Sequence, residues 1–502
     1  MNKGLLALVA ERTKHFLESM PKSLRKSKGQ FFTSLETARF MAGMFDLSLA
    51  PECIRILDPG AGSGMLSAAL VERLNEFGSA QNIHLTCYET DKDINGLLAE
   101  NLELIKVNSS IPLEYELLSE DYIISQQSDF REEILASNNP PKYDLIIANP
   151  PYLRLLRNDA SALAMPGIVH GAPNLYFLFA SMSLFNLRKG GEMVYIIPRS
   201  WTSGLYFLEF RKYLLSRGRA MHIHLFASRN KVFREEEVLQ ETMIIKIRKT
   251  SDTPENVLVT TSHSSVDFNE MTSLNVPYAS IVAGKDTYVF LPTSNDEMEV
   301  ISKIHSYSST LPDEGFRMRT GIVVDFRQWN ELRRQPGEHI VPLFYSQHIR
   351  NGRVNHNPSG KEFDWIVDAK PGLIQRNKNY VFCKRFTAKE EARRLQCGIY
   401  IAEDFPDYDF IGTQNKINYV DLTDGANMDL PAAYGIYALL NSTLFDKYYR
   451  ILNGSTQVNS TEVNSIPVPP GDIIRQIGRR MLEAGELTTQ VCDSILLEVA
   501  YG

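Results

Sequence analysis

Short apolar runs rich in β-branched residues alternate with longer helix-like segments over the first half of the chain. The runs that predict strands are residues 54–57, 83–88, 143–147, 193–197, 221–226 and 243–247. Segments 65–77, 94–106 and 175–187 predict helices between them. Strands separated by helices favour a mainly parallel, doubly wound α/β sheet, and the last two runs predict an antiparallel hairpin at its end.

The pattern changes at both ends of this region. Apolar residues from Leu5 to Met20 recur at helical spacing, which predicts an amphipathic helix that ends before Pro21. From about residue 251, Ser-, Thr- and Asn-rich stretches with short strand-like runs replace the alternation, and helical spacing returns from Asp472 to Tyr501. We therefore predict an N-terminal helical segment (1–50), an α/β domain (51–250) and a mixed α+β domain with a C-terminal helix (251–502).

Composition narrows the class of protein. The 502 residues are 43% hydrophobic and 23% charged, as in globular proteins, and the net charge is −7. That charge excludes blanket attraction to nucleic acid but permits a local basic surface. The five cysteines are scattered without ligand spacing, so we expect a reducing cytoplasm and neither a disulfide framework nor a metal site. No apolar run reaches the ~20 residues of a membrane span, so we expect no membrane partner.

A glycine-rich loop, residues 58–64, follows the first predicted strand. Its glycines permit a tight turn and close backbone approach to a ligand; they are Gly60, Gly62 and Gly64. The loop lacks the Lys-Ser/Thr ending that binds triphosphates. Glu89 ends the next strand, where a carboxylate can accept from both hydroxyls of a ribose. A dinucleotide or S-adenosylmethionine remains, and Asp58 before the glycines suits a ligand with an ammonium group, which favours S-adenosylmethionine.

The tetrapeptide Asn149-Pro150-Pro151-Tyr152 ends the strand predicted at 143–147. Two successive prolines cannot continue a strand, so they form a rigid loop with free carbonyl acceptors at the carboxyl edge of the sheet. Asn149 adds an amide oxygen and Tyr152 a flat aromatic face. An amine on an aromatic ring is a poor nucleophile because its lone pair is delocalised. Two acceptors on its N–H groups would localise that lone pair, and no strong base is then required.

With these motifs in order, residues 22–250 resemble the amino-methylating DNA methyltransferases. The resemblance is greatest to the γ-class N6-adenine enzymes of type II restriction–modification systems, which carry the same tetrapeptide. It implies a Rossmann-like S-adenosylmethionine-dependent methyltransferase domain followed by a target-recognition domain.

The resemblance also implies individual roles. It implies that the cofactor is bound by Phe31 and Thr33 in the segment 28–33, by Asp58, Gly60, Gly62, Gly64 and Glu89, by Asp121 and Tyr122 at its adenine, and by Asn149. It implies that the catalytic residues are Asn149, Pro150, Pro151 and Tyr152, with Phe233 as a second aromatic residue that sandwiches a flipped base.

Basic residues concentrate in the second half of the chain. Residues 315–394 contain 16 Lys and Arg against 8 Asp and Glu. Such a region suits phosphate backbones, and we expect the cluster Lys384, Arg385, Arg393 and Arg394 to face DNA. A solvated face with mixed ion pairs is the alternative. Residues 437–470 resemble the closing segment of recognition domains in restriction–modification enzymes.

We therefore predict a site-specific DNA adenine-N6 methyltransferase that transfers a methyl group from S-adenosylmethionine to a flipped adenine in double-stranded DNA. A cognate restriction endonuclease is expected as a functional rather than a physical partner, and overall resemblance suggests a short palindromic site such as CTGCAG. The alternatives are an N4-cytosine DNA methyltransferase, an RNA or protein methyltransferase, and a non-catalytic DNA-binding defence protein. The sequence does not predict the oligomeric state.

Overall fold

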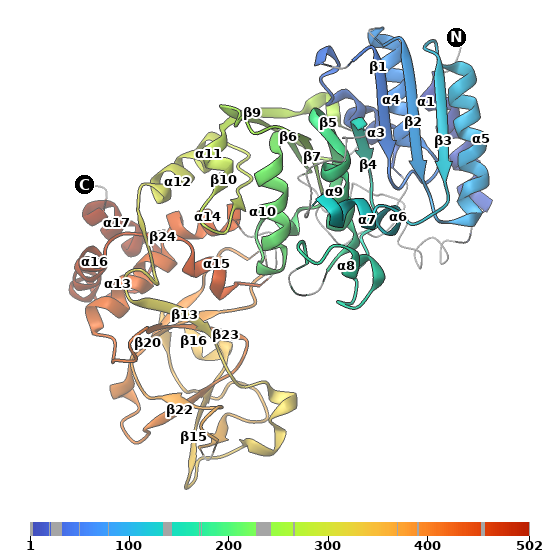
Figure 1. The fold of residues 1–502 in the computed structure, drawn as a ribbon. Helices are drawn as coiled ribbons and strands as arrows, with labels where there is room; N and C mark the ends of the chain where they lie inside the picture. Colours follow the sequence, from blue (N-terminus) through green and yellow to red (C-terminus); the bar gives the residue numbers. More distant parts are fainter. Residues whose placement is uncertain are drawn as a thin grey trace. The chain divides into compact units, whose positions relative to one another are not determined.

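The structure is a computed structural model, and the chain divides into two units, Met1–Ser294 and Asn295–Gly502 (Figure 1). The structure describes residues 4–19, 21, 33–49, 51–78, 80–133, 143–169, 171, 173–226, 242–264, 267–368, 370–388, 391–452 and 457–500. No helix in these ranges is long and apolar enough to cross a membrane.

A nine-stranded sheet forms the centre of unit 1 in the order β3-β2-β1-β4-β5-β7-β6-β8-β9. Its strands are β1 (Cys53–Asp58), β2 (Asn82–Tyr88), β3 (Leu113–Leu118), β4 (Tyr143–Ala148), β5 (Leu187–Pro198), β6 (Arg219–Phe226), β7 (Thr242–Arg248), β8 (Asn256–Ser262) and β9 (Thr272–Pro277). The first five strands pair in parallel, and β7 pairs antiparallel with both β5 and β6. The predicted α/β sheet and its antiparallel hairpin are confirmed.

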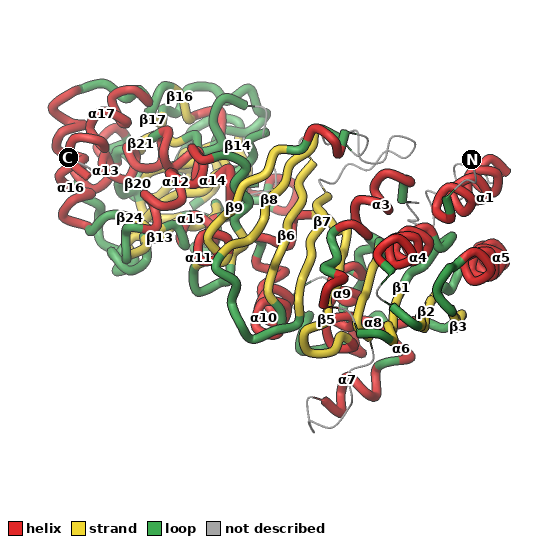
Figure 2. The backbone as a smooth tube through the Cα atoms, turned by 90° about the horizontal axis from the view of Figure 1, so that it is seen from above, coloured by secondary structure: helices red, strands yellow, loops and turns green. Residues whose placement is uncertain are grey.

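Helices cover both faces of this sheet (Figure 2). They are α1 (Leu5–Ser19), α3 (Leu35–Gly43), α4 (Met65–Phe77), α5 (Lys92–Asn108), α6 (Tyr122–Ser125), α7 (Gln127–Glu133), α8 (Ala160–Ala164), α9 (Leu175–Asn186), α10 (Leu208–Arg217) and α11 (Tyr278–Ile281). On one face, α1, α3, α4 and α5 bury a continuous apolar core against the strands. The predicted opening helix is α1, which buries Leu5, Leu6 and Val9.

The predicted domain boundary near residue 250 differs from the structure, in which unit 1 extends to Ser294. The reason is that β8 pairs in parallel with β6, and β9 then pairs antiparallel with β8. A short hairpin of β10 (Val282–Ala283) and β11 (Tyr288–Val289) follows within the same unit. The Ser- and Thr-rich stretch that suggested a new domain therefore lies on an edge extension of the first sheet.

Unit 2 contains a six-stranded and a five-stranded sheet, ordered β13-β23-β20-β21-β17-β16 and β14-β18-β15-β22-β19. The first comprises β13 (Phe316–Thr320), β16 (Ile349–Arg350), β17 (Arg353–Val354), β20 (Tyr380–Lys384), β21 (Cys397–Tyr400) and β23 (Ile417–Leu422). The second comprises β14 (Leu332–Arg333), β15 (Ile340–Phe344), β18 (Trp365–Val367), β19 (Gln375–Arg376) and β22 (Phe410–Thr413). Two further strands, β12 (Ser309–Thr310) and β24 (Pro467–Val468), pair antiparallel.

The helices of unit 2 are α12 (Asn295–His305), α13 (Leu430–Asn441), α14 (Thr443–Leu452), α15 (Ser460–Asn464), α16 (Gly471–Ala484) and α17 (Thr489–Ala500). The helical spacing predicted from Asp472 to Tyr501 is realised as two helices, because Gly485 adopts a φ of +70° and ends α16 before α17 begins. Helices α13 and α16 pack closely at Gly435 and Gly478; a Cβ atom on Gly478 would lie 1.7 Å from the Pro431 carbonyl oxygen.

Candidate active site

A cavity of about 260 Å³ opens in unit 1 at the carboxyl ends of the parallel strands. Its lining residues include predicted site residues from four separate segments: Gly60, Gly62, Glu89, Asp121, Tyr122, Asn149, Pro150 and Pro151. The fold brings these segments together because β1, β2, β3 and β4 run in parallel, so the loops after them meet at one edge. This is where a doubly wound sheet binds its ligand.

The glycine-rich loop after β1 has the backbone conformation that its sequence requires. Gly62 and Gly64 have φ values of +54° and +81°, a region that glycine adopts without steric cost. A Cβ atom on Gly64 would also lie 3.0 Å from Leu98. Gly64 therefore forms the turn into α4. Gly60 and Gly62 line the cavity, whereas Gly64 does not.

Glu89 joins the glycine-rich loop to the end of β2. Its Oε2 accepts from the Gly62 N–H at 2.9 Å, and its Oε1 accepts from the Asp91 N–H at 2.8 Å. Burial raises the pKa of this carboxyl, and the two N–H donors oppose that effect. These bonds fix the rotamer of Glu89 while the side chain still borders the cavity, so a ribose would meet an acceptor that is already oriented.

Asp58 is the last residue of β1 and is completely buried. Burial raises the pKa of its carboxyl to about 7, against the hydrogen bond that the Ser67 hydroxyl donates to Oδ2 at 2.8 Å. Its Oδ1 has no hydrogen-bond partner among the described residues. An unsatisfied buried acceptor just before the lining residues Pro59 and Gly60 fits a ligand that carries a positive charge.

Asp121 and Tyr122 also line the cavity, and different contacts hold each of them. Asp121 caps helix α6, where its Oδ1 accepts from the N–H groups of Ile123 and Ile124. Tyr122 is buried, and its hydroxyl accepts from the Asn186 side-chain amide at 3.0 Å. The cap and the amide hold both side chains in place at the edge of the cavity.

Asn149 directly follows strand β4, and hydrogen bonds at both ends of its side-chain amide orient it. Its Nδ2 donates to the Thr33 hydroxyl at 3.2 Å, and its Oδ1 lies 3.1 Å from the Tyr152 hydroxyl. The Tyr152 hydroxyl also donates toward the Ile196 carbonyl oxygen at 3.0 Å. Tyr152 does not line the cavity, and burial raises the pKa of its hydroxyl far above the usual range, so it stays protonated. Phe31 and Phe233 lie outside the described residues.

Sequence reasoning missed several residues that line the same cavity. Phe179 on α9 lies close to the glycine-rich loop, since a Cβ atom on Gly60 would be 3.6 Å from its ring. That ring packs on Tyr122 at 5.4 Å between centroids. Thr90, Ile94 and Leu175 also line the cavity. Only their position in the sequence could have indicated them: Thr90 and Ile94 follow β2 closely, and Leu175 begins α9.

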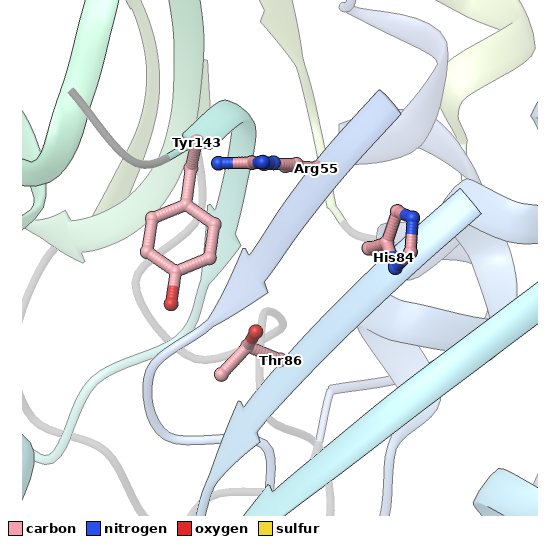
Figure 3. A pocket seen from close by; sticks show the side chains of 4 residues that line it. All are labelled: Arg55, His84, Thr86 and Tyr143. Atoms are coloured by element: carbon pink, nitrogen blue, oxygen red, sulfur yellow. The ribbon is translucent and has the colours of Figure 1, made fainter. Parts of the chain in front are cut away.

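A second cavity, of about 280 Å³, lies on the same sheet and is lined by Arg55, His84, Thr86 and Tyr143 (Figure 3). Figure 3 shows these side chains standing on β1, β2 and the start of β4, with the Tyr143 ring beside Arg55. None of the predicted site residues lines this cavity. Among the described residues, no cluster of three or more His, Cys, Asp or Glu could hold a metal ion.

The structure divides the predicted DNA-facing cluster in unit 2: Arg394 is buried, whereas Lys384, Arg385 and Arg393 are partly exposed, so DNA contact by these three stays a prediction. Arg394 is only 1% exposed, and its Nε donates to the Thr387 hydroxyl at 3.1 Å. Arg393 donates to the Ser442 carbonyl oxygen at 3.0 Å, and Arg385 to that of Asn415 at 2.9 Å. Because guanidinium groups offer several donors, the chain uses them here to satisfy carbonyl oxygens. Local charge alone did not distinguish this role from phosphate binding.

Comparisons with known proteins show the family of the chain. The Eco57I restriction-modification methylase family matches residues 65–233. The chain is 34% identical over 487 residues to the type II methyltransferase M.PstI of Providencia stuartii, covering 95% of this chain and 94% of that protein. It is also 34% identical over 479 residues to the type II methyltransferase M.BsuBI of Bacillus subtilis, covering 94% and 93% respectively.

A solved structure shows that the whole fold recurs. The Type IIL restriction-modification enzyme MmeI, determined in complex with DNA, covers 98% of this chain and 79% of its own at a TM-score of 0.55 and 12% identity. The two type II methyltransferases at 34% identity make S-adenosylmethionine the expected cofactor, and the lining residues and the unsatisfied Asp58 oxygen fit it. The chain belongs to the type II DNA methyltransferases of restriction–modification systems.

Proposed function

We propose that the protein methylates N6 of a specific adenine in double-stranded DNA as the modification enzyme of its system. The observation that carries this proposal is the oriented amide of Asn149 at the cavity. Thr33 accepts from its Nδ2, so the other end of the amide, Oδ1, is the acceptor. An adenine amine offers N–H donors, which an amide oxygen in this orientation can accept.

The catalytic role of the tetrapeptide follows from what its groups can accept. Asn149 Oδ1 and the Pro150 carbonyl oxygen would each accept one N–H of the adenine amine, which concentrates the nitrogen lone pair toward the methyl donor. Pro151 keeps the loop rigid, since proline fixes φ and cannot donate. Oriented acceptors lower the barrier through positioning and electrostatics rather than through a strong base.

Three groups of residues would hold three parts of the cofactor. Glu89 would accept from its ribose hydroxyls, and the loop from Asp58 to Gly64 would hold its methionine portion. Asp121 and Tyr122 would contact its adenine, with Phe31 from the segment before Thr33. When bound, S-adenosylmethionine supplies an electrophilic methyl group on a sulfonium centre.

The target base has to leave the duplex to reach Asn149, at a cost of a few kcal/mol. We propose that Tyr152 offers the flipped base one aromatic wall, and that Phe233 offers the second. The hydrogen bonds of the Tyr152 hydroxyl to Ile196 and Asn149 hold its ring in a fixed position. In the same proposal unit 2 recognises the DNA sequence, and a cognate endonuclease acts on the same site without a stable complex.

Sequencing of genomic DNA from a host that expresses the protein tests this function. Methylated adenines at one short sequence are expected, and they should be absent from a matched host that expresses Asn149→Ala. Modified cytosines at that sequence would instead assign the cytosine-N4 reaction. Unmodified DNA with both proteins, at equal expression of folded protein, would contradict methyltransferase activity on DNA.

A further inference from the structure

Unit 2 exposes large apolar side chains on the connection between β13 and β14. Phe326 is 79% exposed and Trp329 is 57% exposed, while Ile322 on the same connection is 37% exposed. Solvent exposure of a phenylalanine forgoes the favourable transfer of its ring from water. Apolar groups gathered on one surface loop therefore suggest a partner.

The start of this connection is bound firmly to the unit. The N–H of Val323 donates to the Thr413 carbonyl oxygen at 2.9 Å, and the Val323 carbonyl oxygen accepts from the Asn415 N–H at 2.8 Å. A Cβ atom on Gly321 would lie 2.2 Å from the Gln414 carbonyl oxygen, so only glycine fits this approach. The exposure of the following residues is thus not the result of a loose chain.

The turn that carries Phe326 is closed by side chains on either side of it. Gln328 accepts from the Val324 N–H through its Oε1 at 2.7 Å. Asp325 accepts from the Gln414 side-chain amide at 3.3 Å. The residues around Phe326 are bonded back to the unit, and the ring itself is held outward.

One cation lies beside this ring, and a second stands on a loop that is hydrogen-bonded to the same connection. Arg327 follows Phe326, is exposed, and places its guanidinium carbon 5.5 Å from the centre of the Phe326 ring. The exposed Lys416 lies on the loop bonded to Val323, through Asn415. The Lys416 carbonyl oxygen also accepts from the Arg385 N–H at 2.9 Å, which joins this loop to Phe386, an aromatic residue that is 46% exposed.

We propose that Phe326 is a wedge that enters the base stack of the target DNA, with Arg327 and Lys416 on the adjacent phosphates. DNA is the partner that fits, because it presents flat aromatic faces next to anionic groups, whereas an apolar protein surface would leave the two cations without partners. Apolar side chains of this kind unstack base steps in other DNA-binding proteins. The inference rests on the proposed function, since a duplex from which an adenine is flipped has an interrupted stack.

Variants of Phe326 test this assignment. Phe326→Ala should weaken binding of a fluorescently labelled duplex by about tenfold or more, the range for loss of one base–aromatic stack. Phe326→Trp should bind within about threefold of the unsubstituted protein because a larger ring can still stack. Leu497→Ala is the matched control, since Leu497 on α17 is 65% exposed and lies outside this connection. The duplex carries the sequence that is methylated in host DNA.

A second measurement distinguishes insertion of Phe326 between base pairs from a contact with the DNA surface. Duplexes with 2-aminopurine at successive positions should report an unstacked step with the unsubstituted protein, and Phe326→Ala should lose that signal. Normal affinity and an unchanged 2-aminopurine signal for Phe326→Ala would overturn the inference while the unsubstituted protein still methylates DNA. A lower melting temperature of Phe326→Ala without loss of DNA affinity would show that Phe326 stabilises the folded protein itself. That result would also overturn the inference. Failure of the unsubstituted protein to methylate DNA would reject the proposed function instead.

Discussion

The cavity of unit 1 and the basic region of unit 2 use charged side chains in different ways. Around the cavity, Glu89 receives two backbone N–H donors and still borders open space. In the basic region, Arg394 is buried and its donors are used within the unit, whereas Arg327 is exposed beside an aromatic ring. The comparison teaches that the number of charges in a segment does not identify a binding surface. The distinguishing feature is where each charged group lies: hydrogen-bonded inside the unit, at the edge of a cavity, or exposed on the surface.

The largest expected effect concerns the cavity. Asn149→Ala should lower kcat by about a hundredfold or more, because one oriented acceptor for the amine is lost. Binding of S-adenosylmethionine by calorimetry should change little, since Asn149 is proposed to act mainly on the target amine. Thr33→Val should lower kcat by less, because Asn149 remains but the hydrogen bond that orients its Nδ2 is removed. A rate near that of the unsubstituted enzyme for Asn149→Ala would break the account of the site.

The next effect tests the two classes of arginine in unit 2. Arg394→Met should destabilise the protein by about 1–3 kcal/mol, because it leaves the buried Thr387 hydroxyl without the hydrogen bond from Arg394 Nε. Arg327→Met should leave the melting temperature within error but weaken DNA binding and reduce the slope of log K against log salt by about one unit. Calorimetry and a salt series of DNA titrations measure both. A normal melting temperature and a reduced salt slope for Arg394→Met would reverse the comparison.

Glu89→Gln should weaken S-adenosylmethionine binding by about tenfold or more, because a charged acceptor is lost from a partly buried site. Glutamine can also accept from only one of the two N–H groups that hold Glu89, so the glycine-rich loop loses support. Calorimetric titration measures the dissociation constant, and Glu116→Gln on β3, outside the cavity, is the matched control. Equal affinities of the two variants would exclude the ribose role of Glu89.

The last effect is a pH dependence that comes from Asp58. Burial raises the pKa of this carboxyl to about 7, so the folded protein holds a proton on it below that pH. A positively charged ligand favours the ionised carboxylate, so S-adenosylmethionine affinity should fall by up to about tenfold per pH unit below pH 7. Asp58→Asn should remove this dependence. Titrations between pH 5.5 and 8.5 test it, and parallel profiles for both proteins would count against a carboxylate that titrates with cofactor binding.

Much of unit 1 was predictable because its signals are local. Apolar β-branched runs that alternate with helical segments predict parallel strands, and the carboxyl ends of such strands meet, so Glu89 and Asn149 could be assigned to one site from sequence. Phe179 could not, because all but the first residue of α9 are buried and the pattern does not indicate which side chain reaches the glycine-rich loop. The last two strands of the sheet, β8 and the edge strand β9, were missed because their polar residues resemble a linker.

Less of unit 2 was predictable because its decisive features depend on tertiary contacts. The sequence pattern of Arg393 and Arg394 is that of a solvated or DNA-facing pair, yet Arg394 is enclosed beside Thr387 and Tyr449. Exposure of Phe326 is equally invisible in sequence, since an isolated phenylalanine usually predicts core. The break between α16 and α17 did have a local signal in Gly485.

The most direct test of the central claim is the chemical identity of the methylated base. Purified protein, duplex DNA and S-adenosylmethionine with a carbon-13 methyl group are incubated, and the DNA is digested to nucleosides for mass spectrometry. We predict that the label appears in N6-methyladenine and that Asn149→Ala gives at most about one hundredth of that yield at equal times. Label in N4-methylcytosine, or no label in DNA with a protein that binds the cofactor, would contradict the claim.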